Sequence, residues 1–278
     1  MPDTEPNHSY RRAWSITMWN PYLPMPASRR NTLGIASMVS VLLLWSLLSG
    51  LDIVGPSSLP GPWAVARAFM RLVWDGGQSL LFEAALASMG RVAIAGALVF
   101  VVGVPLGILM GASPLTNAVL SPLVDPFRSA PVASLLSVLV MWFGIGEGMK
   151  ISFLFLGAVV YLIPMVRDAI KAVPQTYWIS AYDLGATQFE AVMKAVVPMA
   201  KPRIADAFVA AISIEWTYIT VAEYVNAESG LGRIISDARR ISAMDRIFAT
   251  ILVIIALALL TYRIMTEIKK RLYPWEVE

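Results

Sequence analysis

The chain has 278 residues, of which 57% are hydrophobic and 15% are charged, and its net charge is +3. A soluble domain carries about 25% charged residues, so this chain has too few charges to cover a soluble core. The small net charge also excludes an extended phosphate-binding surface. Because cysteine is absent and the single histidine is His8, the sequence excludes thiolate nucleophiles, Cys/His zinc sites and imidazole catalysis. The composition predicts a polytopic membrane protein, not a soluble enzyme or a nucleic-acid-binding protein.

Several apolar stretches are long enough to cross a hydrocarbon layer, which takes roughly 20 residues of helix. They lie near residues 33–51, 91–112, 130–145, 150–168, 204–224 and 247–266. We expect the third and fourth to form a tight hairpin, because both are short and only residues 144–149 separate them. Arg91 and Arg128 fall at span ends, where a long side chain can reach the membrane interface. The predicted fold is all-α, a membrane bundle of six transmembrane helices with a cytoplasmic coupling-helix loop.

The basic residues predict the orientation. The first apolar stretch follows Arg11, Arg12, Arg29 and Arg30 and has full spanning length, so we expect a retained anchor and not a cleaved signal peptide. With the N-terminus inside, most basic residues fall in inner segments, which predicts that both termini are cytoplasmic; the basic cluster at 233–246 opposes this bias. The expected parts are a cytoplasmic tail (1–32), a first transmembrane helix (33–51), an extracytoplasmic or interfacial segment (52–90), a five-helix core (91–266) and a cytoplasmic C-terminal tail (267–278).

The second span carries glycine at every fourth position. Gly103, Gly107 and Gly111 lie on one face of a helix, where the absence of side chains lets a neighbouring helix approach closely. We interpret them as a helix-packing face. The alternative is that these glycines are tolerated without a special partner.

The inner segment 169–203 is too polar to span the membrane and contains two helix-like parts around Gly185. Tyr177, Trp178, Ala181 and Leu184 share one apolar face, and Phe189, Val192, Met193 and Val196 follow. Pro198 and Pro202 are expected to break the helix before the fifth span. Short helices at the membrane surface suit a docking site for another protein, and a plain surface connection is the alternative.

This segment resembles the cytoplasmic "EAA" loop of ABC-importer permeases. Residues 183–187 read Asp-Leu-Gly-Ala-Thr, followed by Phe189, Val197-Pro198 and Pro202-Arg203-Ile204. With Gly185 on the glycine of the pattern and Pro198 on its proline, residues 179–181 occupy the name-giving positions. Only Ala181 matches there, so the glutamate is absent. The resemblance implies an ATPase-coupling role for Ala181, Asp183, Leu184, Gly185, Ala186, Phe189 and Pro198.

Other motifs resemble the nitrate/sulfonate/taurine/bicarbonate group of these permeases, over about residues 50–275. They are Trp142-Phe143-Gly144-Ile145-Gly146 with Lys150-Ile151, Leu59-Pro60-Gly61-Pro62, Ser88-Met89-Gly90-Arg91-Val92, Trp216 with Val221-Ala222-Glu223, Gly230-Leu231-Gly232 and Pro274-Trp275. One stretch departs from the group. It follows Arg128 and reads Ala-Pro-Val-Ala-Ser-Leu-Leu at 130–136, where the group shows a Pro-Leu-Ala-Trp-Ile-Pro-like run.

The resemblance implies the translocation subunit of an ATP-driven importer for a small polar solute, such as a nitrate-, sulfonate- or bicarbonate-like anion, working by alternating access. It implies two cytoplasmic ATPase subunits that use ATP and magnesium, a second copy of the permease and an extracytoplasmic solute-binding protein, all at the inner membrane of a bacterium. The sequence has no Gly-x-x-x-x-Gly-Lys-[Ser/Thr] motif. We therefore expect this chain to be no enzyme and to hold no cofactor or metal.

Polar residues at membrane depth usually face a cavity. On this ground we predict a translocation pathway lined by Glu215, Trp216, Thr220, Glu223 and Ser134. Glu215 stands near the middle of the fifth span, where the family usually has a small residue, and no lysine or arginine occupies a span centre. In one interpretation Glu215 binds a donor group or positive charge of the solute, which would favour a vitamin precursor or an amine-bearing solute. In the other it is a structural carboxyl bonded to a neighbouring helix or dimer mate.

Two classes compete with the importer. A secondary transporter driven by protons through Glu215 would need no ATPase and often shows paired internal repeats, which the sequence does not display. An intramembrane enzyme would need paired carboxylates, histidines or an activated serine at one depth. The outer segment around Arg239 and Arg240 suits contact with a binding protein or attraction of an anion, and a solvated amphipathic helix is the alternative.

Overall fold

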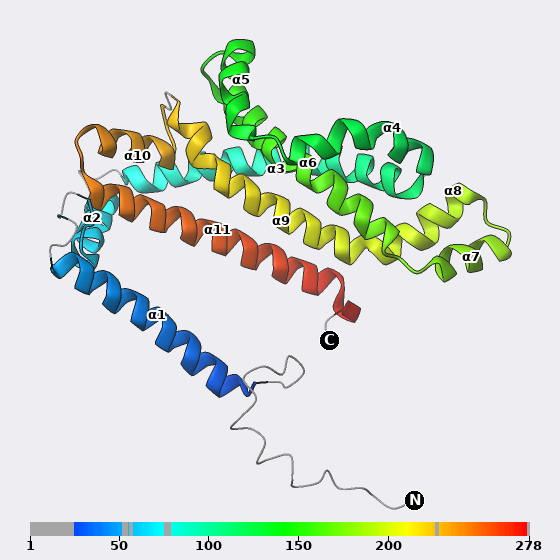
Figure 1. Cartoon of the computed structure of the whole chain (residues 1–278), viewed down its shortest axis with the longest axis horizontal. Coiled ribbons are helices and arrows are strands. Elements are labelled where there is room, and N and C mark those ends of the chain that lie inside the picture. The colour runs from blue at the N-terminus through cyan, green and yellow to red at the C-terminus, as the bar shows by residue number, and fades with distance from the viewer. Residues whose placement is uncertain (1–24, 52–54, 56–57, 75–78, 226–227, 277–278) are drawn as a thin grey trace, which may run out of the picture. The chain divides into compact units, whose positions relative to one another are not determined.

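The structure is a computed structural model and describes residues 25–51, 55, 58–74, 79–225 and 228–276. Most of the predicted N-terminal tail therefore lies outside the described residues. The described residues form helices joined by turns (Figure 1). The chain divides into two compact units, residues 1–54 and 55–278.

The described part of the first unit is one helix, α1 (Ala27–Gly50). Its 24 residues include a long run of leucine and valine whose side chains are exposed. At 1.5 Å per residue the helix is about 36 Å long, enough to cross a hydrocarbon layer of about 30 Å. The helix begins about one and a half turns before the predicted span.

The second unit contains the remaining helices. They are α2 (Pro62–Trp74), α3 (Leu80–Ala112), α4 (Pro114–Val124), η4 (Asp125–Arg128), η5 (Val132–Leu135), α5 (Leu136–Phe143), α6 (Glu147–Lys171), α7 (Gln175–Asp183), α8 (Gln188–Ala191), the π-helical turn η6 (Val192–Val196), α9 (Val197–Tyr224), α10 (Leu231–Arg240), α11 (Met244–Leu272) and η7 (Pro274–Glu276). The centre of the unit is α6, which packs against α3 and α9, while α11 packs against α2, α9 and α10.

Five helices of the described chain are long and apolar enough to span a membrane: α1, α3, α6, the continuous helix Gln188–Tyr224 and α11. A sixth span results if the bent pair Pro114–Arg128 and Val132–Phe143, which meet at 92°, counts as one. The span predicted near 130–145 corresponds to the second arm of this bent pair, and the first arm, Pro114–Arg128, was not predicted as part of it. Pro131 lacks a backbone N–H and interrupts the helix, and the eight residues of α5 reach only about 12 Å.

The glycine face of α3 lies against α6. A Cβ atom on Gly103 would come within 2.9 Å of Leu162 Cδ2, and one on Gly107 would come within 2.6 Å of Val166 Cβ. A Cβ atom on Gly111 would come within 2.6 Å of Ile170 Cβ. The two backbones are thus closer than any side chain at these positions would allow, as expected where helices pack without a hydrophobic driving force.

Candidate coupling and translocation sites

The segment with the motif of the coupling loop folds as two short helices around a glycine turn. Gly185 has φ +90°, a conformation that glycine adopts without steric penalty. Its N–H donates to the Tyr182 carbonyl at 2.9 Å, and the Ala186 N–H donates to the Ala181 carbonyl at 3.1 Å. These bonds close the C-terminus of α7, so the glycine of the motif is required by the turn itself.

The start of α8 is closed by a capping box, which the sequence analysis did not identify. The Thr187 hydroxyl accepts from the Glu190 N–H at 3.3 Å, and the Glu190 carboxylate accepts from the Thr187 N–H at 3.1 Å. Lys194 donates to the same carboxylate at 2.8 Å. The pattern Thr-x-x-Glu is a recognisable signal of a helix start, and it holds α8 in place beside the Gly185 turn.

The turn between α7 and α8 exposes large apolar side chains. Leu184 is 88% exposed and Phe189 is 73% exposed, while Trp178 stacks on Tyr182 with ring centroids 5.2 Å apart. Of the other predicted coupling residues, Asp183 is exposed and Ala181, Ala186 and Pro198 are half-buried. Exposed apolar groups that gather at one place mark an interaction surface. We call residues 175–191 the coupling segment.

The coupling segment continues into the fifth span without a break. The structure has one helix from Gln188 to Tyr224, so the predicted interruption at Pro198 and Pro202 is wrong. Pro198 lies in the first turn of α9, directly after the π-helical turn Val192–Val196. A π-helical turn inserts one extra residue into the hydrogen-bond ladder of a helix. Here it comes just before Pro198 and Pro202, which have no backbone N–H to donate.

The polar residues of α9 divide between two faces. Glu215, Trp216 and Glu223 are buried within the subunit, whereas Ser213, Thr217 and Tyr224 are exposed and Thr220 is half-buried. Because the helix repeats every 3.6 residues, Ser213, Thr217, Thr220 and Tyr224 form one stripe. We call these four residues the polar stripe. Of the residues predicted to line the pathway from this span, only Thr220 belongs to it.

Glu215 points into the subunit. Its side chain is 0% exposed, and a Cβ atom on Gly96 of α3 would lie 3.5 Å from Glu215 Oε2. Within the described residues neither oxygen of Glu215 has a hydrogen-bond partner, and neither does Trp216 Nε1. A buried charge without a partner is costly. In the single chain the Glu215 carboxyl has no exposed surface at which a solute could contact it.

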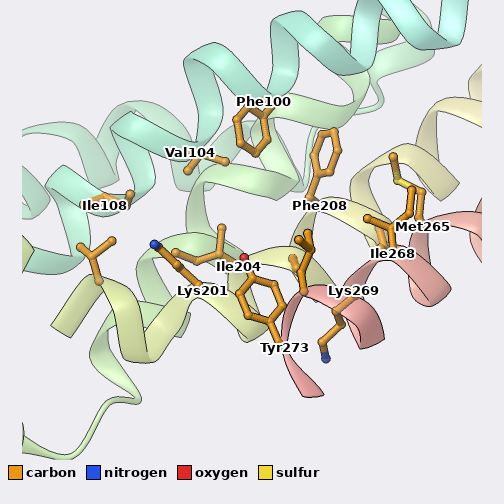
Figure 2. A pocket seen from close by; sticks show the side chains of 14 residues that line it. Phe100, Val104, Ile108, Lys201, Ile204, Phe208, Met265, Ile268, Lys269 and Tyr273 are labelled. Carbon is orange, nitrogen blue, oxygen red and sulfur yellow. The ribbon is translucent and has the colours of Figure 1, made fainter. Parts of the chain in front are cut away.

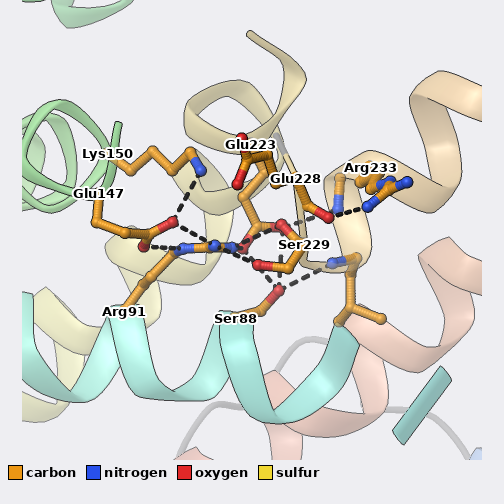
Figure 3. A network of polar contacts seen from close by, with 10 residues as sticks. Ser88, Arg91, Glu147, Lys150, Glu223, Glu228, Ser229 and Arg233 are labelled. Carbon is orange, nitrogen blue, oxygen red and sulfur yellow. Dashed lines mark hydrogen bonds and ion pairs between the residues drawn. The ribbon is translucent and has the colours of Figure 1, made fainter. Parts of the chain in front are cut away.

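Arg91 joins three helices, instead of extending to the interface as predicted. Its side chain is 4% exposed. Figure 3 shows the guanidinium between two carboxylates: Nε and Nη2 donate to Glu147 at 2.6 and 2.7 Å, and Nη1 donates to Glu223 at 2.6 Å. Lys150 also donates to Glu147, at 2.9 Å. Paired, two-pronged hydrogen bonds of this kind are the strong form of an ion pair, so Arg91 ties α3 to the start of α6 and the end of α9.

The same group of residues fixes the start of α10. The Ser88 hydroxyl donates to Glu223 at 2.7 Å and accepts from the Leu231 N–H at 3.0 Å, while Glu223 accepts from the Gly232 N–H at 2.8 Å. A Cβ atom on Gly230, which has φ +111°, would lie 2.5 Å from Arg91 Nη1. The Gly-Leu-Gly motif is thus explained by close packing, and Glu223 acts as a helix cap inside the subunit. We call Ser88, Arg91, Glu147, Lys150 and Glu223 the Arg91 network.

Ser134 and the arginines at the end of α10 were also singled out from the sequence, and neither belongs to this network. Ser134 is in η5, exposed, and its hydroxyl donates to the Pro131 carbonyl at 2.7 Å. On α10, Arg239 donates to the Tyr224 hydroxyl at 2.6 Å and lies 5.7 Å from the centre of the Tyr224 ring. With Ser236 and Arg240 these side chains surround an open hollow of about 480 Å³. Exposed arginines therefore stand at one end of the polar stripe.

Several helices long and apolar enough to span a membrane, with an exposed two-helix segment between two of them, define a multi-pass membrane protein. Comparison gives the family: residues 103–273 match the binding-protein-dependent transport system inner membrane component. This match covers more than half of the chain, so the chain belongs to that family. It is a multi-pass inner-membrane permease subunit of an ABC transporter and is not itself catalytic.

Relatives match almost the full chain. The taurine transport system permease of Escherichia coli is 29% identical over 273 residues, which cover 98% of this chain and 96% of the relative. The putative aliphatic sulfonates permease of Bacillus subtilis is 27% identical over 87% of each chain. The bicarbonate permease of Synechococcus elongatus is 27% identical over 86% of this chain and 88% of the relative. These matches agree with the group that the sequence motifs resemble.

The fold is also found among solved structures. An inward-facing structure of the MetNI methionine ABC transporter includes a chain that matches with a TM-score of 0.65 and 22% identity, covering 71% of this chain and 98% of that chain. At this identity the match supports the helix arrangement alone.

Proposed function

We propose that this chain is the translocation subunit of an ATP-driven importer for a small organic or inorganic anion, with sulfonates as the leading class. The observation that carries the proposal is the set of solutes named for its relatives, namely taurine, aliphatic sulfonates and bicarbonate. Each bears a sulfonate or carbonate oxoanion. Exposed Arg239 and Arg240 on α10 support the choice, because a cationic mouth raises the local concentration of anions.

The pathway proposed for the solute runs along the polar stripe of α9, between two copies of the chain. A stripe that includes Ser213, Thr217 and Thr220 at membrane depth is better placed against water or a polar partner than against lipid. The stripe ends at Tyr224, beside Arg239. Glu215 is left out of this pathway because it has no exposed surface, which removes the reason for preferring an amine-bearing solute over a simple anion.

The proposed partners are two ATPase subunits, which bind ATP and magnesium, and an extracytoplasmic binding protein. Leu184 and Phe189 are the proposed contacts with the ATPase, since both are apolar and exposed on the coupling segment. We propose that the coupling segment and the end of α11 lie in the cytoplasm. The support is the excess of basic residues in the predicted inner segments, among them Lys269, Lys270 and Arg271 at the end of α11. The Arg91 network and α10 are then extracytoplasmic.

The test is uptake by proteoliposomes that hold the permease with its ATPase, supplied with the binding protein. We expect ATP-dependent uptake of radiolabelled taurine or an alkanesulfonate, and none of a cation such as choline. A protonophore should leave the rate unchanged. Uptake that needs no ATPase and follows an imposed pH gradient would contradict the proposal and favour the proton-coupled transporter. ATP-dependent uptake of choline, without uptake of either anion, would contradict the proposed class of solute.

A further inference from the structure

An apolar groove runs between α3, α9 and α11. Figure 2 shows its walls, which include Val104 and Ile108 of α3, Ile204 of α9 and Ile268 of α11. Its volume is about 440 Å³. Phe100 and Phe208 close one end, with their rings edge to face and centroids 5.1 Å apart. The size lies in the range of sites that bind small molecules, about 300–1,000 Å³.

The groove is about as long as one leaflet of a bilayer. On α9 its lining extends from Val197 to Val209, and on α3 from Phe100 to Ile108. At 1.5 Å per residue these stretches measure roughly 18 and 12 Å, whereas half of the hydrocarbon layer is about 15 Å. The groove therefore covers the depth of a single leaflet and does not extend across the membrane.

Cationic and polar side chains stand at the end of the groove opposite the phenylalanines. Lys201 is exposed there and has no ion pair within the described part of the chain, and Lys269 donates to Asp206 at 2.7 Å. Tyr273 completes this end. The last turn of α11 adds two further cations, Lys270 and Arg271. An apolar slot with basic groups at its membrane-surface end matches an acyl chain with an anionic headgroup.

We propose that the groove is a binding site for one anionic phospholipid, with an acyl chain against α3, α9 and α11 and the phosphate at Lys201 and Lys269. The lipid belongs to the cytoplasmic leaflet, an assignment that rests on the orientation given in the proposed function. The site itself does not depend on which solute is transported. A transmembrane helix is a poorer occupant. A helix such as α1, about 36 Å long, would need a groove twice as long.

The proposal is tested by native mass spectrometry of the purified permease–ATPase complex, incubated with dioleoylphosphatidylglycerol or dioleoylphosphatidylcholine. We expect the complex to retain phosphatidylglycerol on the order of tenfold more than phosphatidylcholine. Lys201→Gln should lower the affinity for phosphatidylglycerol about fivefold, the effect of one basic residue near the membrane surface. Ala205→Trp, which fills the groove, should abolish the tightly retained lipid.

Two matched variants control for general effects. Lys171→Gln removes an exposed lysine at the end of α6, and Ala256→Trp adds an exposed indole on α11 outside the groove. Both should retain phosphatidylglycerol as the parent chain does, and size-exclusion chromatography should show intact complexes for all four variants. Because this test measures bound lipid, lipid binding can be absent while the solute is taken up, and lipid can bind while uptake of the solute fails. The two proposals can therefore fail separately.

Three results would overturn the proposal. One is equal retention of the two lipids by the parent complex. Another is undiminished retention of phosphatidylglycerol by Ala205→Trp in an intact complex. The third uses the absence of native cysteine: a high-yield disulfide between Ala205→Cys and a single cysteine introduced in α1 would assign the groove to that helix.

Discussion

The two ends of the helix from Gln188 to Tyr224 are held in place by different kinds of contact. At the Tyr224 end, Glu223 is fully buried and bonds to Arg91, Ser88 and the start of α10. At the Gln188 end the order comes from local contacts, namely the Gly185 turn and the capping box of α8, and apolar side chains remain exposed. The first end is completed within the chain, whereas the second is suited to completion by a partner.

The largest effect is expected from breaking the buried end. Arg91→Leu would leave Glu223 buried without its cation, and removing one partner of a buried ion pair costs about 3–5 kcal/mol. We expect a large loss of thermal stability for the detergent-solubilised chain, measured by tryptophan fluorescence. Arg233→Leu is the control, since its pair with Asp237 is exposed and worth less than about 1 kcal/mol. Equal melting temperatures for the two variants would contradict this view of the Arg91 network.

The next effect concerns the contact between α3 and α6, two helices that pack against α9 between its ends. Gly107→Ala would place a Cβ atom 2.6 Å from Val166 Cβ and 2.8 Å from the Ile163 carbonyl oxygen, and overpacking of this kind costs about 1–3 kcal/mol. Gly90→Ala, where a Cβ atom meets no other group within 4 Å, should leave stability unchanged or slightly raised. The same melting assay compares them. A stable Gly107→Ala variant would mean that α3 and α6 separate at little cost.

A smaller loss of stability, but a clear functional effect, is expected at the exposed end. Gly185→Arg places a side chain on a residue with φ +90°, at a cost of roughly 1–2 kcal/mol, and alters the surface beside Leu184. We expect the ATPase of the reconstituted transporter to continue while uptake falls strongly. Gly148→Arg, at a site with nothing within 4 Å of a Cβ atom and no left-handed φ, is the control. If Gly185→Arg takes up as much solute per ATP hydrolysed as the parent chain, a coupling role for this turn is contradicted.

The smallest effect is expected from Glu215→Gln. The two side chains have nearly the same shape, and Glu215 has no described hydrogen-bond partner to lose, so stability should change by less than about 1 kcal/mol. The KM for the solute should stay the same across pH, because the side chain does not reach the polar stripe. A raised KM, or uptake that changes its pH dependence in the variant, would return Glu215 to the pathway.

Local signals in the sequence predicted much of the fold. Apolar length located the helices around 91–112, 150–168, 204–224 and 247–266, and the spacing of Gly103, Gly107 and Gly111 marked the face that meets α6. The family resemblance drawn from the motifs agrees with the family match. These features depend on residues close together in the chain, which is why they can be inferred from periodicity and spacing.

Contacts between distant residues were not predictable in this way. Ser88 bonds to Glu223 across 135 positions and Leu231 bonds to Ser88 across 143, and neither spacing has a sequence signature. Arg91 was placed at the membrane surface because an arginine at a span end commonly extends there. The structure starts α3 at Leu80, about three turns earlier, so Arg91 lies inside the helix and meets two carboxylates.

The helix that joins the coupling segment to the Arg91 network has a mechanical consequence in the proposed transport cycle. Its 37 residues extend roughly 55 Å at 1.5 Å per residue. A tilt of this helix by about 10° about one end displaces the other end by roughly 10 Å, and rigid-body rotations of this order are common in switching proteins. The π-helical turn at Val192–Val196 lies near the Gln188 end of this helix. If the helix pivots there in the proposed cycle, a small movement of the ATPase at the Gln188 end becomes a larger displacement at the Tyr224 end.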